Sequence, residues 1–384
     1  MLHLFPPRLI PEIMTSKGYA GYMAEMTDMS ERTFRAPFIG PRSEAGIKRA
    51  NENSHQYLLE MWVRRGYDED EISTWLDGLI SEENTFRLAE SFVHGLRGPD
   101  RDFELPETVK LARRIDDISI DAIRAFSTGD VKAQKAHLLG DERLKTFNRP
   151  SLSFGNSAKP EHLCEIVDQA QDTTQLLQAW GVLSENALMA LLAQLDAEYT
   201  GQYFRCTTPP PSFSFVTPQT SPKLTLPHKG RIRDWHRTPV RRLLDVVACM
   251  VYGFEHGHYP ADVPTMEWLA LRAFDPETTT TSPMRRLTRW RRGEVPLTLQ
   301  DFGRLWDTVN ASFEEEGTDL SVMAPLPMVF AALAWQKIYV RLGRKPEQSI
   351  RLIHEDYLAW WAESVKPEQS DLDLQPWPEC FQQI

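Results

Sequence analysis

Strand signals are scarce in this chain, and their scarcity limits the fold classes that it can adopt. Before residue 205, hardly any segment alternates apolar and polar residues over the length of a strand. Apolar residues instead recur every three or four positions, which is the spacing of one helix face. We therefore expect an all-α fold, with these residues in its core: Tyr57, Leu58, Met61, Trp62, Ile72, Trp75, Leu76, Leu79, Val109, Ala112, Ile115, Ile123, Leu188, Met189, Leu191, Leu192 and Leu195.

Cysteine is also scarce. The chain has four cysteines, none of them in a C-x2-C pair: Cys164, Cys206, Cys249 and Cys380. This wide spacing favours a reduced, cytoplasmic protein over a disulfide-stapled secreted domain. His256 and His258 lie close together in EHGHY, but further ligands at metal-binding spacing do not accompany them. We predict no metal and no cofactor.

Catalytic motifs are missing. The sequence contains no G-x-S-x-G, no P-loop, no G-x-G-x-x-G and no H-E-x-x-H. We therefore expect a protein that is not an enzyme. An active site assembled only in three dimensions is the alternative, and Asp116 with Asp117, or the EHGH stretch, would be its candidates. Adjacent aspartates on an amphipathic helix more often form its solvated face, which is the interpretation we prefer.

Long apolar runs are absent as well. The run from Met328 to Trp335 is well short of the roughly twenty residues that a bilayer demands, and Lys337 and Arg341 follow it. The start of the chain, MLHLFPPRLIPEIM, contains prolines within its apolar part and lacks the basic beginning of a secretory signal. We expect a soluble protein with no membrane partner.

Prolines divide the chain into two parts. Six of them within residues 206–230 exclude a continuous helix and favour an extended linker: Pro209, Pro210, Pro211, Pro218, Pro222 and Pro227. A chain of 384 residues is long enough for two ordinary domains. We predict two helical domains, with residues 1–205 for assembly or partner binding and residues 231–384 carrying the functional element described next.

Basic residues are outnumbered, but they gather in one region. The whole chain has 43 basic and 54 acidic residues, whereas residues 223 to 304 have fourteen basic and nine acidic ones. Within the region, residues 283 to 292 (PMRRLTRWRR) carry five arginines and no acid. A dense basic cluster in an otherwise acidic molecule favours an anionic partner.

The arginine segment has the pattern of one short helix. On a helical wheel Met284, Leu287 and Trp290 form an apolar stripe, and the opposite arc holds Arg285, Arg286, Arg289 and Arg292. Arg291 falls at the edge of the stripe, so we expect it to pack or to pair with a local carboxylate. Ser282 and Pro283 are suited to the start of this helix, and Gly293 to the left-handed residue after its end.

A second amphipathic helix follows the turn at Glu294 to Pro296. Thr298 and Asp301 have the spacing of a capping box at its start. Its apolar positions repeat at helical spacing and should face inward: Leu299, Phe302, Leu305, Trp306 and Val309.

LTRWRRGEVP followed by LTLQDFGRLWDTV resembles the end of the helix-turn-helix domain of the lambda-repressor and Cro type. In that family a recognition helix runs into an Arg-Gly, a polar turn and another amphipathic helix. TPVRRLLDVVACMVYGF and PTMEWLALRAF would supply the first two helices, so the resemblance covers about residues 238–313. Two departures are the long DPETTTT connection and Arg291, at whose position the family commonly carries a glutamate.

The resemblance implies a non-catalytic DNA-binding protein, such as a transcriptional or mobile-element regulator. Met284, Arg285, Arg286 and Arg289 would face the major groove, with Arg292 beside them, and guanidinium groups would pair with guanine O6 and N7. A second basic run could hold backbone phosphates: Lys229, Arg231, Arg233, Arg237, Arg241 and Arg242.

Two other interpretations of the arginine face stay open. It can be an ordinary solvated helix surface, or it can dock an acidic protein in an interaction scaffold. We also consider a homo-oligomer, because Trp360 and Trp361 are adjacent on a helix and point about 100° apart. One of these tryptophans should then lie at the edge of the core and offer a contact to a partner subunit.

Overall fold

The protein is described here by a computed structural model. Some residues before residue 64 are described individually: 21, 24, 30, 31, 52, 55, 56, 59, 60 and 63. The other residues that the structure describes are 3–6, 9–14, 68–78, 87–97, 105–148, 160–203, 239–274, 283–292, 294–314, 326–342, 357 and 359–364.

The described part of the chain is entirely helical, so the predicted all-α class is confirmed. It holds thirteen helices and no strand. In chain order they are α1 (Leu9–Met14), α5 (Glu69–Gly78), α6 (Leu88–Arg97), α7 (Pro106–Ser127), α8 (Val131–Gly140), α9 (Glu142–Lys145), α10 (Pro160–Gln169), α11 (Thr173–Tyr203), α12 (Pro239–His256), α13 (Met266–Ala273), α14 (Pro283–Arg291), α15 (Leu299–Glu314) and α16 (Leu326–Leu342).

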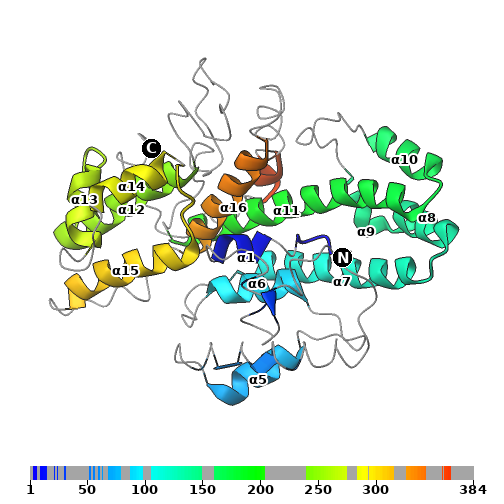
Figure 1. Cartoon of the computed structure of the whole chain (residues 1–384), viewed down its shortest axis with the longest axis horizontal. Helices are drawn as coiled ribbons and strands as arrows, with labels where there is room; N and C mark the ends of the chain where they lie inside the picture. Colours follow the sequence, from blue (N-terminus) through cyan, green and yellow to red (C-terminus); the bar gives the residue numbers. More distant parts are fainter. Residues whose placement is uncertain are drawn as a thin grey trace, which may run out of the picture.

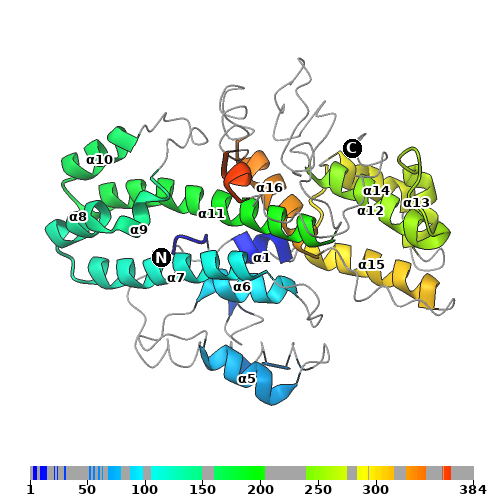
Figure 2. The same ribbon diagram turned by 180° about the vertical axis from the view of Figure 1, so that it is seen from behind.

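The two longest helices, α7 and α11, run side by side and organise the molecule (Figures 1 and 2). α8, α9 and α10 gather at one end of this pair, and α12 to α15 gather at the other. α6 packs along α7, while α16 lies between the two ends and contacts both α11 and α12. Buried apolar side chains from Leu4 to Trp361 form one connected core, to which every described helix except α5 contributes.

α11 is central because it is apolar on nearly all sides. Every residue from Asn186 to Ala193 is buried, so this stretch has no solvated face. Residues Thr173–Tyr199 are also long and apolar enough to cross a membrane, and 67% of the most apolar window is buried inside the protein. Length and composition of this kind are shared by core helices and membrane spans.

Most of the predicted core positions that the structure describes are buried. Leu76, Ala112, Ile115 and Leu191 are among them, whereas Val109 and Ile123 are only partly buried. The side chains of Tyr57, Leu58, Met61, Trp62, Trp75 and Leu79 lie outside the described residues. Trp360 and Trp361 are only 6% and 5% exposed. The prediction that one of them would be available to a partner subunit is therefore wrong.

Contacts connect the helices before residue 205 with those after residue 238. α16 packs on α1, α6 and α11 as well as on α12 and α15. The hydroxyl of Tyr357 donates a buried hydrogen bond of 2.6 Å to Asp196 Oδ2 on α11. The proline-rich residues 206–230 lie outside the described residues, and the predicted domain boundaries stay a prediction.

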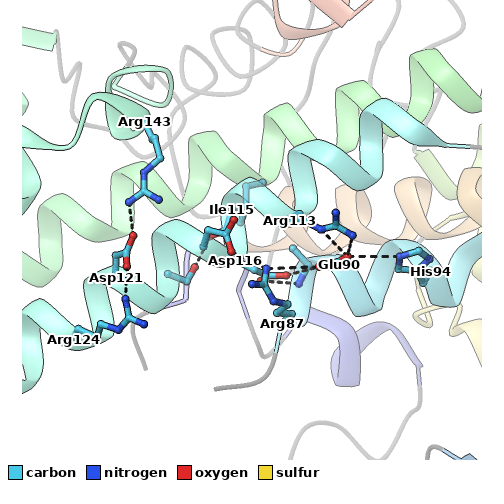
Figure 3. Close-up of polar contacts among 12 residues, drawn as sticks. Arg87, Glu90, His94, Arg113, Ile115, Asp116, Asp121, Arg124 and Arg143 are labelled. Carbon is cyan, nitrogen blue, oxygen red and sulfur yellow. Dashed lines mark hydrogen bonds and ion pairs between the residues drawn. The ribbon is translucent and has the colours of Figure 1, made fainter. Parts of the chain in front are cut away.

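The start of α6 is capped by a side chain from another helix. Asp116 of α7 is buried, and its carboxylate accepts hydrogen bonds from the backbone N–H groups of Ala89 and Glu90 at 3.0 and 2.8 Å (Figure 3). The first N–H groups of a helix have no partner within the helix, so this carboxylate replaces a local cap. Burial raises the pKa of Asp116 to about 7, although these hydrogen bonds oppose the shift.

Other charged groups surround this cap in pairs (Figure 3). Arg113 Nε donates to Glu90 Oε1 at 3.0 Å, and Arg87 Nη1 lies 2.7 Å from Asp117 Oδ1. Burial would raise the pKa of Glu90, but hydrogen bonds from His94 and Arg113 hold it at about 2. The interpretation of Asp116 as part of a solvated face is therefore wrong, whereas Asp117 is partly exposed as expected.

A second trans cap holds the start of α7. Leu105 precedes this helix and has no side-chain acceptor. Glu198 of α11 accepts instead, from the N–H groups of Glu107 and Thr108 at 3.1 and 2.8 Å and from the Thr108 hydroxyl at 2.6 Å. The carboxylate also complements the positive end of the helix dipole, so one side chain fixes where α7 meets α11.

We expect Glu198→Ala to lower the free energy of unfolding by about 2 kcal/mol, because it leaves the first turn of α7 without an acceptor. Urea denaturation followed by circular dichroism measures the effect. Glu142→Ala removes an exposed carboxylate paired only with Lys145 and should cost less than about 0.5 kcal/mol. Equal losses in the two variants would contradict the assigned role of Glu198.

Asp116 should make stability depend on pH. Its pKa is raised in the folded protein, so between about pH 4 and pH 7 the folded state binds more protons than the unfolded state. This residue's contribution to the free energy of unfolding therefore falls as pH rises through that window, by up to about 4 kcal/mol. Urea midpoints measured from pH 4.5 to pH 8 test this.

Asp116→Asn, which cannot titrate, should be less stable than wild type at pH 5 and should approach it at pH 8. Asp117→Asn changes the neighbouring, partly exposed carboxylate and should keep the wild-type pH dependence. A constant difference between wild type and Asp116→Asn across the pH series would show that Asp116 does not titrate in this window.

Candidate nucleic-acid interface

α14 carries the arginine segment and is held on the protein by two apolar side chains. Leu287 and Trp290 are buried, as predicted from their spacing. The ring of Trp290 packs 6.2 Å, centroid to centroid, from Phe274 at the end of α13. α14 contacts both α12 and α13, so its position depends on two neighbouring helices (Figure 1).

The outer face of α14 carries the residues predicted to contact DNA. Arg285, Arg286, Arg289 and Arg292 are all exposed, and Met284 is 39% exposed. Met284 thus lies outside the buried part of the apolar stripe and stands beside the arginines. Within the described part of the chain, no carboxylate pairs with Arg285, Arg286 or Arg289. The structure therefore brings these five predicted residues to one exposed surface, which we call the arginine face.

Two of the arginines have local contacts. The guanidinium carbon of Arg286 lies 5.8 Å from the ring centroid of Trp290 and 6.0 Å from that of Phe274. These distances are within the range of a cation–π interaction, which restricts where the side chain points. Arg292 Nη1 lies 3.8 Å from Glu294 Oε1 in an exposed pair that contributes little to stability.

Arg291 points the other way and joins α14 to α12. Its Nη2 lies 2.9 Å from Oδ1 of the buried Asp245, and Nε of Arg241 lies 3.9 Å from the other oxygen, Oδ2. Of the two predicted roles of Arg291, packing or pairing with a carboxylate, the structure shows the second, although the carboxylate is 46 positions away in the sequence. The pair lies on the same inner side of α14 as Leu287 and Trp290, opposite the other four arginines.

The predicted ends of the helices are confirmed where the structure describes them. The N–H of Glu294 donates to the Arg289 carbonyl at 2.9 Å, which closes the last turn of α14. Thr298 Oγ1 accepts from the Asp301 N–H at 3.0 Å, as an N-cap does, and donates to Asp301 Oδ2 at 2.7 Å, so the arrangement is similar to a capping box. Ser282 and Gly293 lie outside the described residues.

α15 and α13 have the expected orientation and start. Phe302, Leu305, Trp306 and Val309 are buried, and Leu299 packs against the core while partly exposed. Thr265 caps α13 by accepting from the Trp268 N–H at 3.2 Å. The connection Asp275 to Thr281 lies outside the described residues, and α13 and α14 pack against each other.

The second basic run is described only at its end. Lys229, Arg231, Arg233 and Arg237 lie outside the described residues, and their role in phosphate contact stays a prediction. Arg242 is buried at 3% exposure, so the prediction that it tracks phosphates is wrong. It lies in the first turn of α12, which begins at Pro239, on a side of the helix that faces the core.

The EHGH stretch builds the end of α12. His256 Nδ1 lies 3.1 Å from the Tyr252 carbonyl oxygen, and the two rings stack 4.0 Å apart. Gly257 has φ of 71°, a left-handed conformation that favours glycine, and its N–H donates to the Gly253 carbonyl. Among the described residues, no group of three or more His, Cys, Asp or Glu side chains is arranged to hold a metal.

Asp245 is the site residue that sequence reasoning missed. In RRLLDVVACM it is a lone acid between apolar residues, a pattern that signals a buried charge needing a partner. The sequence places Arg241 one turn before it but does not show that Arg291, 46 positions away, is its closer partner. That pairing depends on how α12 and α14 pack.

Comparison with known proteins provides no further assignment. No family model, no curated protein and no solved structure matches the chain. The resemblance to the lambda-repressor and Cro type therefore stays a prediction, based on the residues of α12 to α15.

We expect Asp245→Asn to lower the free energy of unfolding by about 2 to 3 kcal/mol, because Arg291 would keep a half-buried charge without its carboxylate. Arg289→Ala, a change on the exposed side of the same helix, should stay within about 0.5 kcal/mol of wild type. Urea titrations of both variants decide the matter. Matching midpoints for Asp245→Asn and wild type would mean that this ion pair does not hold α14.

Proposed function

We propose that this protein is a non-catalytic, cytoplasmic DNA-binding protein that inserts the arginine face of α14 into the major groove, as a transcriptional or mobile-element regulator would. The observation that carries the proposal is the segregation of charge on α14. Arg291 pairs inward with Asp245, while Arg285, Arg286, Arg289 and Arg292 face outward. Four arginines lie on the nine residues of α14 and a fifth, Arg292, follows the helix. One of the five pairs inside the protein, and the other four face solvent.

The packing of α14 supports groove entry. A helix that enters the major groove has to be exposed along one side and firmly attached along the other. Leu287 and Trp290 attach α14 to α12 and α13 without covering its outer side. The helix that follows, α15, begins at the Thr298 N-cap a few residues after α14 ends.

The chemistry of arginine supports an anionic partner of defined geometry. A guanidinium group presents a planar fork that pairs with the O6 and N7 acceptors of guanine or with two phosphate oxygens. The rest of the chain is acidic, so its surface would repel nucleic acid. Binding to nucleic acid would therefore be concentrated at the arginine face and, by prediction, at Lys229, Arg231, Arg233 and Arg237.

The alternative is an α-helical interaction scaffold whose arginine face docks an acidic protein. Arginine is enriched in protein interfaces, and the exposed Met284 beside Arg285 would add apolar contact. This function predicts stoichiometric protein binding and no affinity for duplex DNA. The two proposals thus differ in one direct measurement.

That measurement is duplex binding by fluorescence anisotropy across a salt series, with intact protein and with an Arg285→Ala/Arg286→Ala/Arg289→Ala variant. We expect wild type to bind with a steep salt dependence. The variant should bind roughly tenfold more weakly or worse, and its slope of log K against log salt should be shallower by up to about 3, because three phosphate or base contacts are lost.

A matched control is Lys110→Ala/Lys132→Ala/Lys145→Ala, which removes the same charge from exposed positions on α7, α8 and α9. It should bind like wild type, since these lysines lie on helices outside the α12 to α15 group (Figure 2). If the two triple variants lost equal binding affinity, the loss would be due to net charge and not to the arginine face. No binding by wild type at low salt would reject DNA and favour the scaffold.

A further inference from the structure

We infer that the arginines of the arginine face have two different roles. Arg285 and Arg289 read guanine bases, and Arg286 binds a phosphate of the DNA backbone. The inference rests on the proposed DNA binding and specifies its target as duplex DNA with guanines in the major groove. It assigns different roles to three side chains that their sequence pattern treats as equivalent.

The positions of Arg285 and Arg289 favour base contact. They are four residues apart, so they lie one above the other along α14. On the helical wheel they fall near the middle of the exposed arc, which is the part of a helix that reaches deepest into a groove. Among the described residues, neither side chain has an ion pair, a hydrogen bond or a ring contact. Both guanidinium forks are therefore free to pair with guanine O6 and N7.

The position of Arg286 favours contact with a phosphate of the DNA backbone. Its guanidinium carbon lies 5.8 and 6.0 Å from the ring centroids of Trp290 and Phe274, at the border between α14 and α13. Contact with these rings directs the side chain toward the rim of the face, away from its middle. Phosphates line the rims of a groove, and a guanidinium held there meets phosphate oxygens before it meets bases.

The remaining polar side chains of the face have contacts within the chain. Thr288 Oγ1 donates to the Met284 carbonyl at 2.7 Å, so its hydroxyl proton is used within the helix. Arg292 lies beyond the last residue of α14 and pairs with Glu294. Arg285 and Arg289 thus remain as the unengaged donors of the middle of the face.

The test begins with selection of duplexes from a pool with a random core by the full-length wild-type protein. Binding constants are then measured for a selected duplex and for a scrambled duplex of the same composition, across a salt series. The ratio of the two constants reports base reading, and the salt slope reports the number of phosphates contacted.

The decisive variant is Arg285→Lys/Arg289→Lys, which keeps both charges and removes both forks. We expect the ratio between selected and scrambled duplexes to fall roughly tenfold or more, with the salt slope unchanged. Arg286→Ala should instead weaken binding to both duplexes alike and make the slope shallower by about 0.9, the value for one phosphate. All three positions are exposed, and circular dichroism checks that each variant is folded.

The outcomes separate the inference from the proposed function. A wild-type protein that binds no duplex overturns both. If wild type binds duplexes but selects no sequence, or if Arg285→Lys/Arg289→Lys keeps the full ratio, only the assignment of base reading is overturned. If Arg286→Ala lowers the ratio of selected to scrambled binding as much as the double variant does, then Arg286 has no role different from that of Arg285 and Arg289.

Discussion

Buried backbone N–H and C=O groups have to find hydrogen-bond partners, and in this protein polar side chains of α7 and α11 supply them across helix boundaries. On α7, Asp116 caps α6, and Ser119 accepts from the N–H of Leu4 at 2.9 Å. On α11, Ser184 donates to the Leu4 carbonyl, and Glu198 caps α7. These polar groups lie on the buried sides of the two longest helices and connect the segments that pack against them.

The same logic of buried polar partners governs α14. Asp245 is buried on α12 and pairs with Arg291 of α14, so this pair adds a directional contact to the apolar contacts of Leu287 and Trp290. Apolar burial alone is tolerant of small rotations, whereas an ion pair at 2.9 Å is directional. The burial of Leu287 and Trp290 and the Arg291–Asp245 pair are thus both consistent with an outward position of the other arginines.

Local patterns predicted the arginine segment well because they act over a few residues. The alternation of apolar and basic positions placed Leu287 and Trp290 inward, and the spacing of Thr298 and Asp301 identified the cap of α15. The same reasoning failed for Asp116, Arg242 and the Trp360–Trp361 pair, since a residue type sets only its average preference for solvent. Their burial depends on which other helix covers them.

The sequence by itself determined the helical class, the starts of several helices and the faces that they bury. Backbone sterics, capping and apolar periodicity are properties of neighbouring residues, and they need no knowledge of the rest of the chain. Tertiary structure alone decided that Glu198 caps a helix whose start is 90 residues away and that Asp245 pairs with Arg291. It also decided that Arg286 lies near the rings of Phe274 and Trp290. Such pairings depend on the packing of whole helices, and the local pattern does not encode them.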